Sequence, residues 1–390
     1  MRAAITAPIF TLEAEKELPA EWDEGLLTDA KAALSNLDGA AFILYQTIWK
    51  GRNNMKKKLS ALLLAGLMTL SLAACGSAPA ANPSSNPEGS STEPADGKTY
   101  TVGICQYVQH EALDAATQGF KDALVEALGE GVVEFKESNA SGENANCAPI
   151  INDFVSSNVD LILANATAPL TAAASATAEI PILGTSVTDY ATALEMDEWT
   201  GTTGRNISGT TDLAPLDGQA DMIKELFPDA KNVGLLYCSA EANSQYQVDE
   251  MTKYLTDLGY TCTPFSFTDT NDVASVTQAA CDASDVIYIP TDNTAASNTE
   301  AIANVVLPAK KPVVTGEQGI CKGCGVATLS IDYYELGQIT GQMAARILTG
   351  EADISATPVE SAPNVTKMYN AANCDALGIT IPSGYTATEG

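Results

Sequence analysis

Along most of the chain, short runs of apolar residues alternate with longer segments in which apolar residues recur every three or four positions. The segment after residue 111 shows the second pattern, since Leu113, Ala116, Phe120, Leu124 and Leu128 would share one face of a helix. The runs that predict strands are 100–105, 132–135, 159–164, 180–184, 232–237, 260–267, 285–290, 312–315 and 328–331. The segments that predict helices are 112–127, 145–157, 170–177, 215–226, 244–258, 273–280, 295–305 and 334–348. Strands that alternate with helices predict parallel βαβ units and therefore an α/β fold.

The alternation starts again in the middle of the chain. KNVGL at 231–235 resembles YTVGI at 100–104, and each opens a run of strands and helices. This predicts two similarly wound parallel-sheet lobes rather than one large sheet. In such sheets ligands bind beyond the carboxyl ends of the strands. The loops expected to carry a site are 106–111, 165–169, 185–190, 239–244, 291–294 and 316–318.

Composition narrows the class of partner. The chain has 390 residues, enough for two ordinary domains, and a formal net charge of −29. A surface this acidic disfavours nucleic acid, whose phosphates are bound by lysine and arginine. We therefore expect a small-molecule ligand and no nucleic acid.

The predicted loops are rich in hydrogen-bonding side chains and poor in basic ones. Acidic groups can bind an ammonium, while hydroxyls and helix N-terminal amides can bind a carboxylate, so the loops suit a small polar or zwitterionic ligand. The alternative is helix capping, because Asp292, Thr188 and Ser244 each sit just before a helix or at its start, where such residues are favoured. For one residue alone the two interpretations are equal, but for the whole set binding is favoured.

The sequence does not indicate an enzyme. It contains one histidine, His110, and has neither a G-x-S-x-G nucleophile elbow nor a Walker-type loop. We predict no catalytic residue, no cofactor and no metal site. His110 either lines the ligand cleft or caps the following helix, and its position in a strand-end loop favours the cleft.

Nine cysteines are present. Cys105 and Cys238 end predicted strands and are expected to be small buried residues. Cys321 and Cys324 form a C-x-x-C pair, for which a loop disulfide, free thiols, a redox pair and half of a zinc site are all open. Gly323 and Gly325 indicate a turn, which favours a disulfide or free thiols over catalysis.

Residues 55–75 have the anatomy of a secretion signal. Lys56, Lys57 and Lys58 precede an apolar run that ends at LAAC, residues 72–75. This ending resembles a bacterial lipobox, which implies a lipidated Cys75 as the mature N-terminus. The alternative is an uncleaved apolar helix that ends in a structural cysteine.

The segments on either side of the signal have different characters. Residues 76–98 are rich in Ser, Pro, Ala and Gly, contain no large apolar residue, and predict a disordered tether. Residues 1–54 precede a signal that belongs at the extreme N-terminus, so we interpret them as a mis-assigned extension with Met55 as the true start. The alternative is a real cytoplasmic extension, with residues 59–74 acting as a signal anchor.

Four motifs in the expected order resemble those of the substrate-binding lipoproteins of ABC importers, in the branch named for tryptophan or tyrosine binding. They are ICQYVQHEALD at 104–114, YCSAEANS at 237–244, IPTDNT at 289–294 and SIDYYELG at 330–337. The resemblance covers about 99–382. The sequence departs from the family pattern at Glu111 and in loop 316–325, which contains two cysteines.

The resemblance implies a type I periplasmic-binding-protein fold with two Rossmann-like lobes joined by a three-strand hinge. The crossings are expected near 209–213, 315–318 and 357–361, which gives one lobe from 99–211 plus 317–356 and the other from 212–316 plus 357–390. It also implies a monomer held by its lipid at the extracytoplasmic face of the cell membrane, which delivers its ligand to permease and ATPase subunits. Within the same fold, a sugar or nucleoside binder and a ligand-sensing subunit are alternatives, and a redox enzyme built on Cys321 and Cys324 is an alternative of another class.

For an amino-acid ligand, we expect Thr167 and Thr188 to bind the carboxylate, and Asp292 to bind the ammonium, with Asp332 or Glu241 as second choices. The full set of predicted ligand-binding residues is Gln106, His110, Leu113, Asn165, Ala166, Thr167, Thr188, Asp189, Glu241, Asn243, Ser244, Asp292, Asn293, Glu317 and Asp332.

Overall fold

Two sheets of mostly parallel strands organise residues 98–388, the part of the chain that this computed structural model describes. The described residues belong to one compact unit. The predicted extension, the signal and Cys75 lie outside the described residues. Within 98–388, no helix combines the length and apolar character needed to cross a bilayer.

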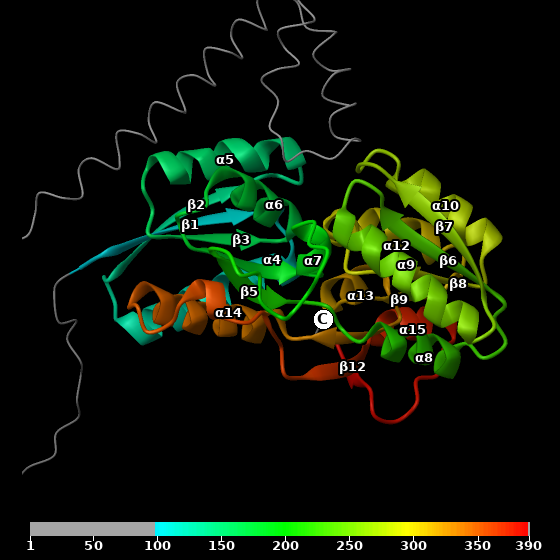
Figure 1. Cartoon of the computed structure of the whole chain (residues 1–390). Coiled ribbons are helices and arrows are strands. Elements are labelled where there is room, and N and C mark those ends of the chain that lie inside the picture. Colours follow the sequence, from blue (N-terminus) through cyan, green and yellow to red (C-terminus); the bar gives the residue numbers. More distant parts are fainter. Residues whose placement is uncertain (1–97, 389–390) are drawn as a thin grey trace, which may run out of the picture. The chain divides into compact units, whose positions relative to one another are not determined.

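The first sheet has the strand order β11-β5-β4-β3-β1-β2, and its neighbouring strands are parallel. Its strands are β1 (Tyr100–Gln106), β2 (Val133–Asn139), β3 (Leu161–Asn165), β4 (Ile182–Val187), β5 (Ile207–Thr211) and β11 (Glu360–Ser361). Its helices are α4 (Glu111–Leu128), α5 (Asn144–Ser156), α6 (Thr167–Ala176), α7 (Tyr190–Ala193) and α14 (Tyr333–Leu348), followed by the short 3-10 helix η1 (Ile354–Ala356). Central strands β3 and β4 are buried at every position because helices cover both faces of the sheet (Figure 1).

The second sheet has the order β13-β12-β10-β9-β8-β6-β7. Its strands are β6 (Asn232–Cys238), β7 (Thr261–Phe267), β8 (Val286–Ile289), β9 (Val313–Thr315), β10 (Ala327–Ile331), β12 (Val365–Tyr369) and β13 (Thr386–Ala387). Its helices are α8 (Leu216–Leu226), α9 (Ala242–Asp257), α10 (Val273–Ala283), α11 (Asn293–Ala296), α12 (Thr299–Val306), α13 (Gln318–Cys324) and α15 (Ala371–Leu377). All its pairs are parallel except β10 with β12. The predicted fold class, two α/β lobes with parallel sheets, is confirmed.

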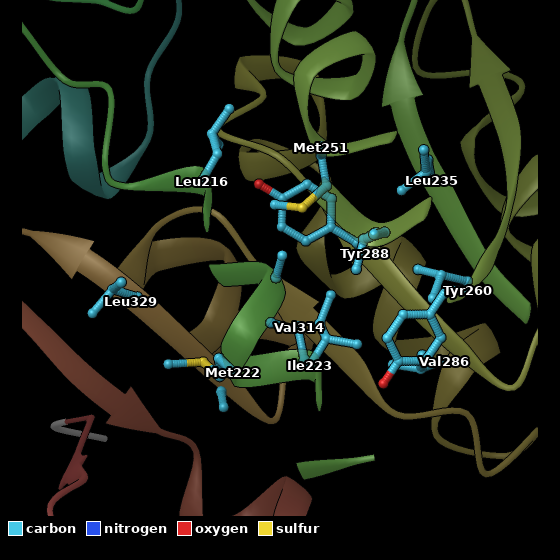
Figure 2. Packing of buried hydrophobic residues seen from close by; sticks show 14 of the residues in the cluster. Leu216, Met222, Ile223, Leu235, Met251, Tyr260, Val286, Tyr288, Val314 and Leu329 are labelled. Atoms are coloured by element: carbon cyan, nitrogen blue, oxygen red, sulfur yellow. The ribbon is translucent and has the colours of Figure 1, made fainter. Parts of the chain in front are cut away.

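The core of the second lobe also positions a loop of the site. Figure 2 shows Tyr288 among Met251, Val314 and the residues of α8. The Tyr288 hydroxyl donates to Gln219 Oε1 at 2.5 Å, and Gln219 Nε2 donates to the carbonyl of Gly316 at 3.2 Å. The buried side-chain amide of Gln219, whose hydrogen bonds are satisfied, therefore fixes the start of loop 316–318 from the core side.

Two of the predicted lobe boundaries are wrong. Segments β9 and β10 both belong to the second sheet, where Thr315 pairs with Ile289 and with Thr328. The second crossing therefore lies between β10 and α14, at 331–333, rather than near 315–318. Strand β11 pairs with β5 in the first sheet, so the third crossing follows Ser361 and that lobe does not end at 356. The predictions failed because a short apolar run does not show which sheet it joins.

Candidate functional site

A pocket of about 420 Å³ lies between loops and helices of the two lobes. The first lobe contributes Tyr107, the start of α6 at Thr167, and alanines of α5 and α6. The second lobe contributes Glu241, Asn243 and Asn293. The pocket thus has small apolar walls and hydrogen-bonding groups on both sides. Thr167, Glu241, Asn243 and Asn293 were predicted from the sequence, while Tyr107 was not.

The first lobe contains buried hydroxyls without partners, and one of them, on Thr167, lies at the pocket. Within the described residues, Thr167 Oγ1 and Ser186 Oγ lack any hydrogen-bond partner, as does Asn165 Oδ1. Ala166 (φ 96°) and Ser186 (φ 54°) both have left-handed backbone conformations, which cost energy for residues other than glycine. Strained backbone and unpaired buried hydroxyls are typical of a binding site. The sequence gives no signal for Ser186.

Glu241 forms the acidic part of the second-lobe wall. It precedes α9, and its carboxylate also reaches the start of α11. Oε1 accepts from the Thr294 N–H at 2.8 Å and from the Thr294 hydroxyl at 2.7 Å. Oε2 accepts from the Asn293 N–H at 3.1 Å and from Asn293 Nδ2 at 2.6 Å. The carboxylate therefore orders the loop that presents Asn293 to the pocket.

Asp292 has a structural role that differs from its predicted one. Oδ1 accepts from the Ala295 N–H at 2.7 Å as a helix cap, and Oδ2 accepts from the Cys238 N–H at 2.6 Å. Burial, with a smaller contribution from Glu241, raises the pKa of Asp292 to about 7. Both oxygens are directed to the backbone, which argues against the expected contact with a ligand ammonium.

Asp212 and Tyr333 meet where two of the chain crossings pass between the lobes. Asp212 Oδ2 accepts from the Tyr333 hydroxyl at 2.9 Å, and Oδ1 accepts from the Thr188 hydroxyl at 3.0 Å. Burial raises the pKa of Asp212 to about 6. Sequence reasoning missed both Asp212 and Tyr333, although an aspartate directly after a strand at a crossing was an available signal for the first.

Glu317 is buried at the start of α13. It accepts from the Gly319 N–H at 2.6 Å and from the Ile320 N–H. Burial raises the pKa of Glu317 to about 7. Its carboxyl group caps α13, and the negative charges of Glu111 and Asp212 add to the rise of its pKa.

The other predicted residues do not gather at the pocket. The Gln106 side chain forms its hydrogen bonds inside the first lobe, with Asp114, Thr117 and the Val108 carbonyl. Asp332 is exposed and caps α14, and Asp189 caps α7. Leu113 and Ser244 are fully buried: Leu113 packs in the apolar core, and Ser244 lies beside Asp292.

The C-x-x-C pair lies on a helix and not in the predicted turn. Cys321 and Cys324 are free thiols within α13. Burial raises the pKa of both thiols, so neither has the reactive thiolate character of a redox cysteine. Among the described residues, no group of three or more His, Cys, Asp or Glu side chains could hold a metal ion.

Within the described residues, polar contacts also join the lobes away from the chain crossings. His110 Nε2 lies 3.1 Å from Asn293 Oδ1, and Asn144 Nδ2 donates to the Ala240 carbonyl at 3.3 Å. Next to His110 in the chain, Glu111 forms an ion pair with Lys322 at 3.3 Å. Burial lowers the pKa of His110, while the hydrogen bond to Asn293 acts in the opposite direction.

We expect His110→Ala to shift the ligand-free protein toward a more open arrangement. One hydrogen bond contributes about 0.5–1.5 kcal/mol, so the ratio of closed to open molecules should fall roughly two- to tenfold. Solution scattering should show a larger radius of gyration than for wild type. Gln118→Ala is the matched control, because its side chain bonds only to Asp122 on the same helix. Equal scattering profiles for both variants would contradict the prediction.

Two lobes joined by three crossings, with a pocket between them, define a two-lobed binding protein. Residues 101–387 match the family of ABC transporter substrate binding proteins, and the chain belongs to that family. Proteins of this class bind a small-molecule substrate outside the cytoplasm for an ABC transporter and are not enzymes. This confirms the family suggested by the four motifs.

Relatives with known names or structures agree with this assignment. The chain is 32% identical to a tyrosine-binding protein of Clostridioides difficile, over 78% of this chain and 88% of that protein. It resembles an ABC domain from Streptococcus pneumonia in complex with L-Trp (30% identity, 74% and 100% of the two chains, TM-score 0.71). It also resembles a ligand-free, open substrate binding protein with adhesive properties from Clostridium difficile (33%, 75% and 100%, TM-score 0.58). A 5-methylthioribose-binding protein from Thermotoga lettingae, at 14% identity, shares the fold alone.

Proposed function

We propose that this protein captures an aromatic α-amino acid in the pocket between its lobes and delivers it to the permease and ATPase subunits of an ABC importer. The pocket is the observation that carries this proposal. Its volume of about 420 Å³ falls within the range of roughly 300–1,000 Å³ for small-molecule sites. Alanines 148, 168 and 172 leave room for a ring, and Tyr107 offers an aromatic face.

The relatives support the choice of ligand. One has the name tyrosine-binding protein, and another was solved with L-Trp. The chain has a higher TM-score to the Trp-bound structure than to the open ligand-free one, although the two identities are similar. The inter-lobe contacts of His110 and Asn144 fit such a closed arrangement.

Isothermal titration calorimetry tests the ligand directly. Residues 98–388, purified without added amino acids, should bind at least one of tryptophan, tyrosine and phenylalanine, and should not bind glucose or adenosine. Binding of the sugar or nucleoside, with none of the three amino acids, would overturn the amino-acid proposal and leave only the family assignment.

We also propose that the mature protein begins at a lipidated Cys75, works as a monomer, and that residues 1–54 are absent from cells. The proposal rests on the lysines, apolar run and LAAC sequence of 55–75. Cys75→Ala should move the protein from the membrane fraction to the medium or leave it unprocessed, since the acyl chains supply the membrane affinity.

Mass spectrometry of the protein in the membrane fraction tests the start site, and it should detect no peptide from 5–50. Such peptides at normal abundance would refute the assigned start.

A further inference from the structure

Three neighbouring strand ends of the first lobe bring unpaired hydroxyls close to a buried acid. Strands β3, β4 and β5 are adjacent in the sheet. Just after β3 and β5 end, the Ala166 N–H donates to the Thr185 carbonyl at 3.0 Å, and the Asp212 N–H donates to the Val187 carbonyl at 3.3 Å, both at the end of β4. Ser186 lies between these two contacts. The three ends therefore lie side by side in the order Thr167, Ser186 and Asp212.

The β3 and β4 ends offer donors. Thr167 and Ser186 are 7% and 6% exposed, and neither hydroxyl has a partner among the described residues. A buried polar group without a partner is costly, so such groups are rare away from binding sites. Helix α6 begins here without a side-chain cap, because Ala166 occupies the N-cap position. Its first N–H groups and partial positive charge point to this end, which suits an anion.

The third unpaired atom, Asn165 Oδ1, belongs to an amide that is bound to α4 through its nitrogen. Asn165 Nδ2 donates to the Leu113 carbonyl at 2.8 Å and to the Thr117 hydroxyl at 2.9 Å, both on α4. The amide is thus held against that helix inside the lobe. We therefore assign no ligand contact to Asn165 Oδ1.

The β5 end offers a carboxylate with acceptor capacity to spare. Asp212 receives one hydroxyl on each oxygen, from Thr188 and Tyr333, whereas a carboxylate has about four acceptor positions. The carboxylates of Asp292 and Glu241, in contrast, are held by several N–H groups at helix starts. Among these three acids, Asp212 is therefore the one best able to accept hydrogen bonds from a cation.

We propose that these three strand ends form the subsite for the head group of an α-amino acid. The hydroxyls of Thr167 and Ser186 and the start of α6 bind the carboxylate, and Asp212 binds the ammonium. This inference rests on the proposed function. Thr167 also lines the pocket, so the side chain of the ligand would extend from the head group into the space beside Tyr107.

The spacing of the strands agrees with such a ligand. The ends of β3 and β5 are two strand spacings apart, about 9–10 Å. Two charge-assisted hydrogen bonds of about 2.8 Å each leave a gap of a few ångströms, which matches the width of an amino-acid head group. The site needs no arginine, because hydroxyls and helix N–H groups can bind a carboxylate.

The experiment compares ligands that lack one end of the zwitterion. The wild-type protein is titrated with tyrosine and tryptophan, with their methyl esters, and with 3-(4-hydroxyphenyl)propionate and indole-3-propionate, which lack the amino group. Removing either charge should weaken binding about thirtyfold or more, because it leaves a buried charged or polar group unpaired.

The variants then assign each end. Asp212→Asn should lose most of the preference for the amino acid over its des-amino analogue. Thr167→Val combined with Ser186→Ala should instead lose the preference for the free acid over the ester. Asp160→Asn and Thr277→Val are matched controls outside the cleft. The Asp160 carboxylate accepts from the Thr101 N–H of β1, and the Thr277 hydroxyl donates to the Val273 carbonyl within α10. They should retain both preferences.

Each outcome decides between the two levels of the proposal. If wild type binds an amino acid but Asp212→Asn, folded by circular dichroism, keeps the wild-type preference, the head-group assignment is wrong and the proposed function survives. The same holds if esters bind as well as free acids. If no amino acid binds wild type, the proposed function and this subsite both fall.

Discussion

Gly337→Ala should unfold the protein at a clearly lower temperature than wild type, although alanine is the better helix former. At the crossing of α4 and α14, a Cβ on Gly337 would overlap the backbone of Ala116, with 2.8 Å to its carbonyl carbon. Gly119 and Gly341 make similarly close approaches from the two helices. Since backbone atoms cannot move aside, the helices must separate.

The size of the effect follows from two opposed contributions. Replacing glycine by alanine in a helix gains about 1 kcal/mol of propensity. Overpacking costs typically about 1–3 kcal/mol, and a clash with backbone lies at or above the upper end of that range. We expect a net fall in Tm of roughly 5 °C or more, measured by calorimetry.

Gly218→Ala is the matched control within a helix. Its added Cβ would meet only the end of the Leu329 side chain and one atom of Pro215, which can be accommodated. This variant should keep or slightly raise Tm. A Gly337→Ala protein as stable as Gly218→Ala would show that the helices do not approach as closely as the structure has them.

The same variant should affect binding. Helix α14 begins at Tyr333, whose hydroxyl bonds to Asp212, directly after the crossing from the second lobe. Helices forced apart would displace Tyr333 and release one of the two hydroxyls that hold the Asp212 carboxylate. The folded fraction of Gly337→Ala should therefore bind its ligand more weakly, while Gly218→Ala should bind as wild type.

The sequence predicted the α/β lobes because that information is local. Apolar periodicity over ten residues is enough to recognise α4 or α9, and their alternation with strands implies parallel sheets. Sheet membership is not local. Segments 313–315 and 327–331 have the same character as any buried strand, and only their pairing with β8 and with each other assigns them to the second lobe.

The candidate site likewise contains residues that local sequence patterns predict and residues that only the fold brings together. The strand-end rule led to Thr167, Glu241, Asn243 and Asn293, which do lie at the pocket. Their contact with a ligand stays a prediction. Ser186 was missed because its importance lies in a left-handed backbone conformation within a strand. Asp212 and Tyr333 are 121 positions apart and meet only because two crossings run side by side.

The ligand-free protein should also be more stable at pH 5 than at pH 8. Burial raises the pKa of Asp212 to about 6 and the pKa values of Asp292 and Glu317 to about 7. In the unfolded chain the same groups ionise near pH 4. Because the folded protein holds these protons more tightly, the resulting stabilisation is fully present below the unfolded pKa and is lost as pH rises through the folded pKa.

The expected change is large because several groups act in one direction. Each unit of raised pKa corresponds to about 1.4 kcal/mol, so even partial contributions from three groups should raise Tm by roughly 5 °C or more between pH 8 and pH 5. Asp285 acts in the opposite direction, since N–H groups of Asn232 and Lys231 lower its pKa. Its contribution is lost only as pH falls below about 4, so stability should be greatest between about pH 4 and 5.

Variants separate these contributions from the general acidity of a chain with a net charge of −29. Asp292→Asn and Glu317→Gln remove a group that must ionise in a buried place, so each should flatten the rise of Tm toward pH 5. Asp285→Asn removes one carboxylate of the same charge at the surface and should leave the slope between pH 5 and 8 unchanged. Calorimetry at constant ionic strength distinguishes the cases. If all three variants keep the wild-type slope, that slope arises from surface repulsion, and the buried carboxyl groups are not the cause.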